Sequence, residues 1–286
     1  MGNDSAATNL ATDIWAVPAY LPYVQSPLTE EMVRTAEAAI GHRLPAAYVQ
    51  LLRQQNGGYI RLHLPDCVHD TICGIGPRFP HLEPPDWSEA REEVSFSLDG
   101  LVPFDGDGHW HLCFDYRDGA TTPKITYIDL ESDSERPIAP DFESYLALLK
   151  PEAKDGDFVI FTGNTIDAVV ENLTRLLKVP FENLGCFDQG YPVYRASLGQ
   201  ISRKSLTEWI FVSPNLVPRG FVREDDDEFD ALKSGMTGTA LRYPKFPATS
   251  LLLSITEASS GKVVAKLKEA GFDLKPLKRA LEATSE

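Results

Sequence analysis

Residues 40–58 bring together the end of one helix, the start of another and a glycine-rich exit. Before this segment, Thr29 can cap a helix whose apolar residues recur at helical spacing up to Ile40. Gly41 suits the end of that helix. Pro45 suits the first turn of the next helix, because its missing N–H would have no partner there anyway. These signals predict a helical hairpin.

The second helix of this hairpin has an apolar stripe and a double-glycine end. Tyr48, Leu51 and Leu52 lie on one helical face. Gly57–Gly58 supplies the backbone freedom to leave the helix with positive φ and enter a strand at 59–62. The hairpin is therefore expected to fold onto a sheet.

The rest of the first half predicts short strands, one proline-rich loop and a closing helix. Residues 77–87 carry four prolines, which favour a loop over a helix or a paired strand. Alternating or β-branched residues predict the other elements. These are strands at 59–64, 92–98, 110–116 and 124–130, and a helix at 141–149.

The second half predicts another α+β unit. The best boundary is 150–157, which contains Pro151 and Gly156. Thr165 can cap a helix that Pro180 stops. The Ile-Gly, Leu-Pro and Asn-Gly-Gly series of the first half is absent, so no internal repeat is expected. Strands are predicted at 158–161, 191–196, 209–212 and 250–255, and further helices at 262–269 and 276–283.

The run Ile40–Leu52, closed by Asn56-Gly57-Gly58, resembles the SUKH superfamily, also called the Smi/Knr family. Its members open with an Ile-Gly, Leu-Pro, Tyr and Asn-Gly-Gly helical pair. Residues 101–117 resemble the family's loop and following strand, and 138–149 its closing helix. The resemblance covers roughly residues 20–150, and the second half resembles no family. The proline-rich loop and His109 depart from the family pattern.

The resemblance and the boundary together define the expected organisation. Residues 1–20 form a flexible leader, 21–150 a SUKH-like domain, and 151–286 a second α+β domain of unknown family. In the first domain, the helical pair packs on a mostly antiparallel sheet and a closing helix follows.

Net charge is concentrated in the first half. The chain carries a net charge of −15. Residues 1–150 hold 10 Lys and Arg against 23 Asp and Glu, a net −13, whereas 151–286 hold 17 against 19, a net −2. An acidic domain repels phosphate backbones, which argues against direct nucleic-acid binding and favours a basic protein partner. Acidity that only keeps the protein soluble is the alternative.

Cysteine usage and the absence of targeting signals predict a cytoplasmic protein. Cys67, Cys73, Cys113 and Cys186 are few and scattered, as expected for reduced thiols. Residues 1–6 lack the charged start and apolar run of a secretion signal, and Ala6 stands where a myristoylation acceptor needs Ser or Thr. No apolar run approaches the ~18 residues of a membrane span.

Two groups of residues raise the question of a metal site. Cys67, His69, Cys73 and His81 are zinc-capable, but their C-x-H-x₃-C spacing matches no usual knuckle, so ordinary loop and strand positions are favoured and zinc remains an alternative. Residues 105–108 resemble the start of a calcium loop but lack its later Gly and Glu, which favours a turn joining two strands. We expect no metal and no cofactor.

The sequence predicts no catalytic residues. His109 and His111 would share one strand face opposite a buried Trp110, and an exposed polar face is favoured over an acid–base pair. The carboxylates of 224–228 favour a solvated loop over a metal site. Nucleophile-elbow, Walker and dinucleotide motifs are absent.

The family resemblance implies a non-catalytic binding protein. Many bacterial members are immunity proteins that sequester a toxin domain, often a nuclease or deaminase, and an acidic domain suits a nuclease's basic groove. The alternatives are a regulatory or scaffold module, as in fungal members, and an enzyme within 155–286. The predicted contact residues, with core packing or turn capping as the alternative, are Asp105, Asp107, Trp110, Asp115 and Asp118. The oligomeric state is left open.

Overall fold

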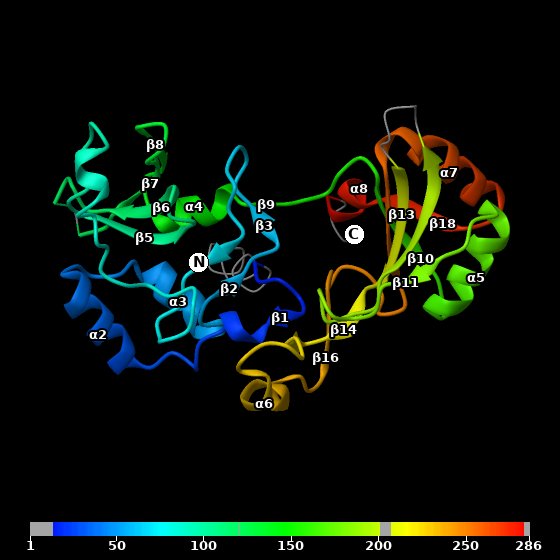
Figure 1. Cartoon of the computed structure of the whole chain (residues 1–286), viewed down its shortest axis with the longest axis horizontal. Helices are drawn as coiled ribbons and strands as arrows, with labels where there is room; N and C mark the ends of the chain where they lie inside the picture. Colours follow the sequence, from blue (N-terminus) through cyan, green and yellow to red (C-terminus); the bar gives the residue numbers. More distant parts are fainter. Residues whose placement is uncertain (1–13, 120, 201–206, 283–286) are drawn as a thin grey trace, which may run out of the picture. The chain divides into compact units, whose positions relative to one another are not determined.

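The computed structural model describes residues 14–119, 121–200 and 207–282, and it divides the chain into two compact units (Figure 1). The units span Met1–Pro151 and Glu152–Glu286. Each combines helices with antiparallel sheets, so the predicted α+β class is confirmed.

The helical hairpin predicted from residues 40–58 is present in the first unit. Helix α2 (Glu30–Ile40) begins after Thr29, whose hydroxyl accepts a hydrogen bond from a backbone N–H of the first turn at 3.2 Å. It ends at Gly41, which has a left-handed φ of 75°. Helix α3 (Ala46–Gln54) follows Pro45 directly. Thr29, Gly41 and Pro45 therefore lie at the helix ends where the sequence predicted them.

A four-stranded antiparallel sheet is the scaffold of the first unit. Its strand order is β5-β6-β7-β8. The bounds are β5 (Leu101–Gly106), β6 (Trp110–Asp115), β7 (Lys124–Asp129) and β8 (Ser134–Ala139). The predictions for β6 and β7 are confirmed. The sequence missed β8 and assigned β5 to a loop, because Pro103 and the Asp-Gly run are typical of turns. As an edge strand, β5 tolerates that proline and carries a bulge at 103–105.

The two faces of this sheet are covered differently. On one face, α3 and the closing helix α4 (Phe142–Leu148) bury a cluster of aromatic rings. Asp141 caps α4 by accepting a hydrogen bond from the Ser144 N–H at 2.7 Å. On the other face, the segment after the proline-rich loop packs Trp87 and Leu98 against Cys113 and Ile128. The fully buried rings of the first face are Tyr48, Phe104, Phe114, Phe142 and Tyr145.

The prediction of a strand at 92–98 is wrong. This segment consists of bends and turns after a short 3-10 helix, η2 (Ala90–Glu92). Its alternating apolar residues, Val94, Phe96 and Leu98, pack onto the outer face of the sheet and do not pair with a neighbouring strand. The alternation of apolar residues indicates that one side of the segment is buried. A loop that covers a sheet can bury that side as well as a strand can.

Short elements complete the first unit. Strand β2 pairs with β4, and β3 pairs with β9, which follows α4. Their bounds are β1 (Ala19–Tyr20), η1 (Leu21–Tyr23), β2 (Gly58–Tyr59), β3 (Leu62–His63), β4 (Thr71–Ile72) and β9 (Lys150–Pro151).

The second unit is built on a six-stranded antiparallel sheet with the order β11-β12-β13-β17-β10-β18. Strands β17 and β18 both run antiparallel to β10, which lies between them, and helix α7 connects the two. The bounds are β10 (Asp157–Phe161), α5 (Ile166–Leu177), β11 (Glu182–Asn183), β12 (Tyr194–Gln200), β13 (Thr207–Pro214), β17 (Leu251–Ile255), α7 (Glu257–Glu269), β18 (Asp273–Pro276) and α8 (Leu277–Glu282).

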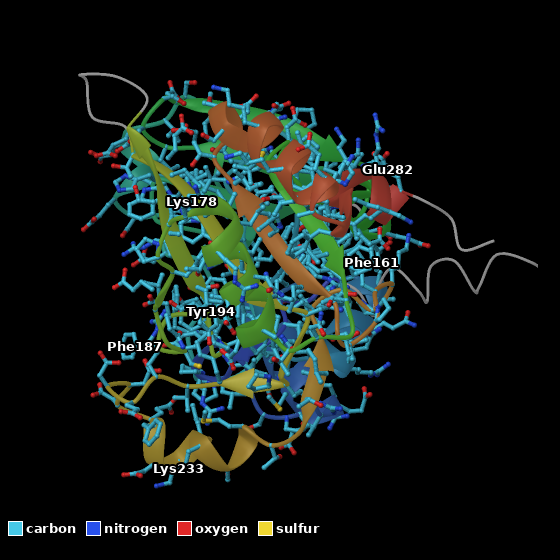
Figure 2. The ribbon with its side chains drawn as sticks, turned by 90° about the vertical axis from the view of Figure 1, so that its right-hand side faces the viewer. Phe161, Lys178, Phe187, Tyr194, Lys233 and Glu282 are labelled. Carbon is cyan, nitrogen blue, oxygen red and sulfur yellow. The ribbon has the colours of Figure 1, made fainter. Side chains whose placement is uncertain are left out.

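Helices cover one face of this sheet, and α8 covers part of the other. Figure 2 looks onto the side that carries α5 and α7, whose apolar residues bury the strands behind them. The cap predicted at Thr165 is confirmed, because its hydroxyl accepts the Ala168 N–H at 3.3 Å. On the opposite face, Leu277 of α8 packs with Val159, Phe246 and Leu252.

An insertion between β13 and β17 was not predicted. Fully buried Asn215 organises it: its side chain accepts the Tyr243 N–H at 2.9 Å and donates to three carbonyls at 3.2 Å each. The carboxylates of 224–228 lie in a mostly exposed turn of this insertion, as expected. Its elements are β14 (Leu216–Pro218), β15 (Gly220–Phe221), α6 (Phe229–Leu232), η3 (Lys233–Gly235) and β16 (Thr239–Leu241).

The backbones of Gly57 and Gly74 approach closely where the chain leaves α3, and substitution of Gly57 tests this packing. Gly57 has a φ of 85°, and a Cβ there would lie 2.6 Å from the Gly74 nitrogen, whereas a Cβ on Gly41 meets nothing within 4 Å. Gly57→Ala should therefore destabilise the first unit by roughly 2 kcal/mol or more beyond Gly41→Ala, which carries only backbone strain of about 1 kcal/mol.

Urea unfolding on a Trp209→Phe background measures this difference, since the remaining three tryptophans all belong to the first unit. Equal losses for the two variants would contradict the close packing of the two backbones.

Candidate functional site

The β5–β6 turn presents Asp107 at one end of the sheet. Its Oδ1 accepts hydrogen bonds from the N–H groups of His109 at 2.9 Å and Trp110 at 3.1 Å. Partial desolvation acts to raise the pKa of Asp107, but these hydrogen bonds hold it below its ordinary value. Asp107 is therefore an exposed carboxylate, fixed in position and charged at neutral pH.

Three side chains from neighbouring strands form an aromatic column beside this turn. Trp110 of β6 stacks on Tyr127 of β7, with ring centroids 5.8 Å apart and planes 14° from parallel. The Arg136 guanidinium of β8 lies over the same tyrosine, 5.6 Å from its centroid. Arg136 also donates to the Cys67 Sγ at 2.9 Å. The aromatic column (Trp110, Tyr127 and Arg136) combines the residue types that most often dominate protein interfaces.

Carboxylates and one apolar side chain surround the aromatic column. We use the term acidic rim for Asp107, Asp129 and Glu131, which lie at the turns of the two hairpins. Within the rim, Glu131 pairs with His109 at 2.9 Å. On the loop that carries Cys67, Val68 is 72% exposed. The arrangement is a half-buried aromatic centre with a charged border, as in protein-binding surfaces.

A buried polar network lies beneath this surface. Asp105 is only 4% exposed. With its proton on Nδ1, His69 donates to Asp105 Oδ2 at 2.5 Å, and its Nε2 accepts from the Tyr145 hydroxyl. The Thr71 hydroxyl donates to the other Asp105 oxygen. Burial, and then the Asp105 charge, raise the pKa of Tyr145, so this hydroxyl stays protonated and available as a donor.

This network joins segments that are distant in the sequence. Asp105 belongs to β5, Tyr145 to α4, and His69 to the loop that carries Cys67 and Val68. The network therefore fixes that loop against the sheet. Asp105 is held in the interior and cannot reach a partner. Its role is therefore to support the surface through the contacts that it makes with the loop.

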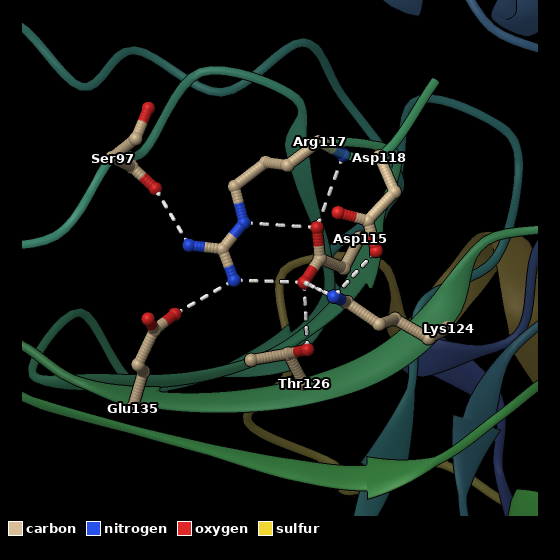
Figure 3. A network of polar contacts seen from close by, with 7 residues as sticks. All are labelled: Ser97, Asp115, Arg117, Asp118, Lys124, Thr126 and Glu135. Carbon is tan, nitrogen blue, oxygen red and sulfur yellow. Dashed lines mark hydrogen bonds and ion pairs between the residues drawn. The ribbon is translucent and has the colours of Figure 1, made fainter. Parts of the chain in front are cut away.

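A second network, shown in Figure 3, lies on the opposite face of the sheet. Asp115 is 2% exposed. It accepts hydrogen bonds from Arg117 at 2.9 and 2.7 Å and from the Thr126 hydroxyl at 2.8 Å. Arg117 bridges onward to Glu135 at 2.7 Å. Desolvation acts to raise the pKa of Asp115, but the Arg117 and Thr126 hydrogen bonds hold it below its ordinary value.

The predicted contact residues thus divide into two groups. Asp105 and Asp115 are interior carboxylates whose oxygens are occupied by neighbouring side chains. Asp107 and Trp110 meet at one end of β6, whereas exposed Asp118 lies beyond its other end and pairs with Lys124 at 2.7 Å. Asp107 and Trp110 therefore remain the predicted contact residues that share one surface, and Asp118 lies apart from them.

The zinc-capable residues occupy separate settings. His69 uses both ring nitrogens in the buried network. His81 pairs with Glu83 at 3.1 Å, and burial raises the pKa of Cys73. Burial likewise raises the pKa of Cys67, although Arg136 opposes this effect. In the described part of the chain, no three His, Cys, Asp or Glu side chains gather where they could hold a metal ion.

The two histidines flanking Trp110 do not form a pair. His109 lies in the turn, before β6 begins, and is exposed. His111 lies on the strand and packs edge-on against Trp87 at 5.3 Å on the other face of the sheet. Burial lowers the pKa of His111. His109 lies in the hairpin turn, so the strand alternation on which the expectation of a shared face rested does not extend to it.

Residues 27–148 match the model of the SMI1 / KNR4 family (SUKH-1). The match lies within the first unit and confirms the resemblance predicted from the helical pair. A match to this family is consistent with an interaction or immunity module. No curated protein and no solved structure matches the chain. Among the described helices, none has the length and apolar character to cross a membrane.

Removing the buried Asp105 carboxylate should strongly destabilise the first unit. Asp105→Ala leaves His69 and Thr71 without their acceptor, and we expect a loss of about 3–5 kcal/mol in the unfolding free energy. Asp118→Ala removes the same charge at an exposed pair and should cost under about 1 kcal/mol. Urea unfolding measures both, and similar losses would contradict the supporting role of Asp105.

The Asp115 network predicts a pH-dependent contribution to stability. Because its folded pKa is depressed, Asp115 contributes stability that is present above its unfolded pKa of about 3.9 and is lost as the pH falls through the folded value. Asp115→Asn should therefore destabilise the unit by about 2 kcal/mol at neutral pH. Below about pH 4 the gap between wild type and variant should close. A gap that stays constant down to pH 2.5 in urea unfolding would contradict the ion pair.

Proposed function

We propose that this protein is a non-catalytic immunity protein that neutralises a basic, nuclease-like toxin domain by covering its active surface. The observation that carries the proposal is the aromatic column bordered by the acidic rim. It lies in a unit whose residues 1–150 hold 10 basic and 23 acidic side chains. The match to the SUKH-1 family supports an interaction module.

Charge would bring the two proteins together. A nuclease must bind a polyanion, so its substrate groove is basic, and an acidic domain can occupy that groove. Long-range attraction raises the association rate and weakens as salt screens it, with a Debye length of about 10 Å at 0.1 M. Asp107 and Glu131 are exposed and would contribute to this field.

The aromatic column would supply the short-range contact. Tyr127 has Trp110 and Arg136 as neighbours on the strands that flank it. Stacked rings provide large contact area with few rotatable bonds, so little side-chain entropy is lost when a partner packs on them. A Lys or Arg of the toxin could in turn lie against the Trp110 ring near Asp107. Inhibition then follows from occlusion, with no covalent step.

The presence of a second folded unit favours the alternative, a regulatory or scaffold module. It has its own core and sheet and a net charge near zero. A scaffold would use both units to bind separate partners. All six histidines lie before residue 112, so acid–base chemistry within the second unit would depend on other side chains.

Growth protection separates these functions. The chain is co-expressed with the toxin-like reading frame nearest its gene, and growth is compared with that of cells expressing the toxin alone. We expect the wild-type chain to rescue growth fully. The double variant Trp110→Ala and Asp107→Lys should bind the toxin at least tenfold more weakly, a loss of about 1.4 kcal/mol or more in binding free energy.

Asp118→Lys, at the other end of β6, is the matched control, because it makes the same charge change outside the aromatic column. It should retain rescue. A wild-type chain that binds the toxin without rescuing growth would contradict neutralisation. So would a chain that co-purifies only with housekeeping proteins, and either result would favour a scaffold.

A further inference from the structure

A hollow of about 490 Å³ lies at the turn between α2 and α3, far along the sequence from the aromatic column. Its walls come from the last two turns of α2 and the three residues that follow. The lining residues are Arg34, Glu37, Ala38, Gly41, His42 and Arg43.

The walls of this hollow are held in place. Glu37, with a side chain 12% exposed, accepts hydrogen bonds from the Leu44 N–H at 3.0 Å and from Arg43 at 2.8 Å. The Tyr116 hydroxyl donates to the Arg43 carbonyl at 2.6 Å. The His42 ring stacks on the Tyr116 ring at 4.1 Å and 8°. The turn is therefore organised before any ligand arrives.

The charge around the hollow is opposite to that of the unit as a whole. Arg34 has no ion-pair partner within the described ranges. The Arg43 side chain is 82% exposed, and only one of its guanidinium nitrogens is bonded to Glu37. Each Glu37 oxygen already accepts one hydrogen bond, and Arg43 balances the Glu37 charge. What remains available is a set of donors from two guanidinium groups and one imidazole.

We infer that this hollow binds a small oxyanion, a carboxylate or a phosphate group. Guanidinium groups recognise both oxyanions through paired N–H donors. Tyr116 forms a neutral support under His42, since burial and the neighbouring Glu37 raise the pKa of its hydroxyl. Exposed charge pairs are weak, so a small probe ion should bind with a dissociation constant on the order of millimolar. The site is independent of the proposed toxin surface.

Titration of the full chain tests this inference. Inorganic phosphate and acetate are added separately at constant ionic strength, and the backbone amide NMR signals of Gly41, His42 and Arg43 are followed. Saturable shifts at these amides are expected for at least one probe. Saturation by phosphate alone identifies a phosphate site, and saturation by acetate alone identifies a carboxylate site.

Matched arginine variants give the control. Arg34→Gln should weaken binding at least tenfold, while its amide signals away from the hollow stay unchanged. Arg53→Gln removes the same charge from α3, where Arg53 pairs with Glu30 at 2.5 Å, and should bind as wild type does. Linear shifts with both probes, or equal weakening by the two variants, would overturn the inference, because either result indicates only a general charge effect.

Discussion

The contact between the Asp105 carboxylate and the His69 ring holds together the part of the first unit that carries the proposed partner surface. It joins an edge strand to a loop 36 residues earlier in the chain, and His69 passes the contact on to Tyr145 of the closing helix. A buried carboxylate is tolerated only when its oxygens are satisfied, and here both are. The surface above it is consequently fixed before a partner binds.

Pre-organisation matters because binding otherwise has to order the loop and the side chains of the surface. The loop with Cys67 and Val68 is tied down from beneath by His69, and from the side by Arg136. The acidic rim can then act through its field without supporting the fold. The division between interior carboxylates that build the unit and exterior ones that meet solvent explains how a domain with 23 acidic residues among its first 150 forms a compact core.

Local signals predicted the helical pair because each depends on backbone chemistry at one position. Thr29, Gly41 and Pro45 act through a cap, a left-handed φ and a missing N–H, and all three are visible in the sequence. The role of Asp105 was not visible, since Asp-Gly-Asp-Gly is typical of a turn and the burial of Asp105 is set by the distant His69. Likewise Trp110 was predicted, but Tyr127 and Arg136 join it only through the register of three strands.

Hydrogen exchange of the chain, free and bound to the basic toxin domain that we propose it neutralises, tests whether a partner contacts the end of the first unit's sheet. Contact at the end of this sheet should slow the exchange of the backbone amides of 107–111 and 127–136 in the complex, while those of β10 and β17 stay unchanged. Slower exchange confined to residues 152–286 would contradict it.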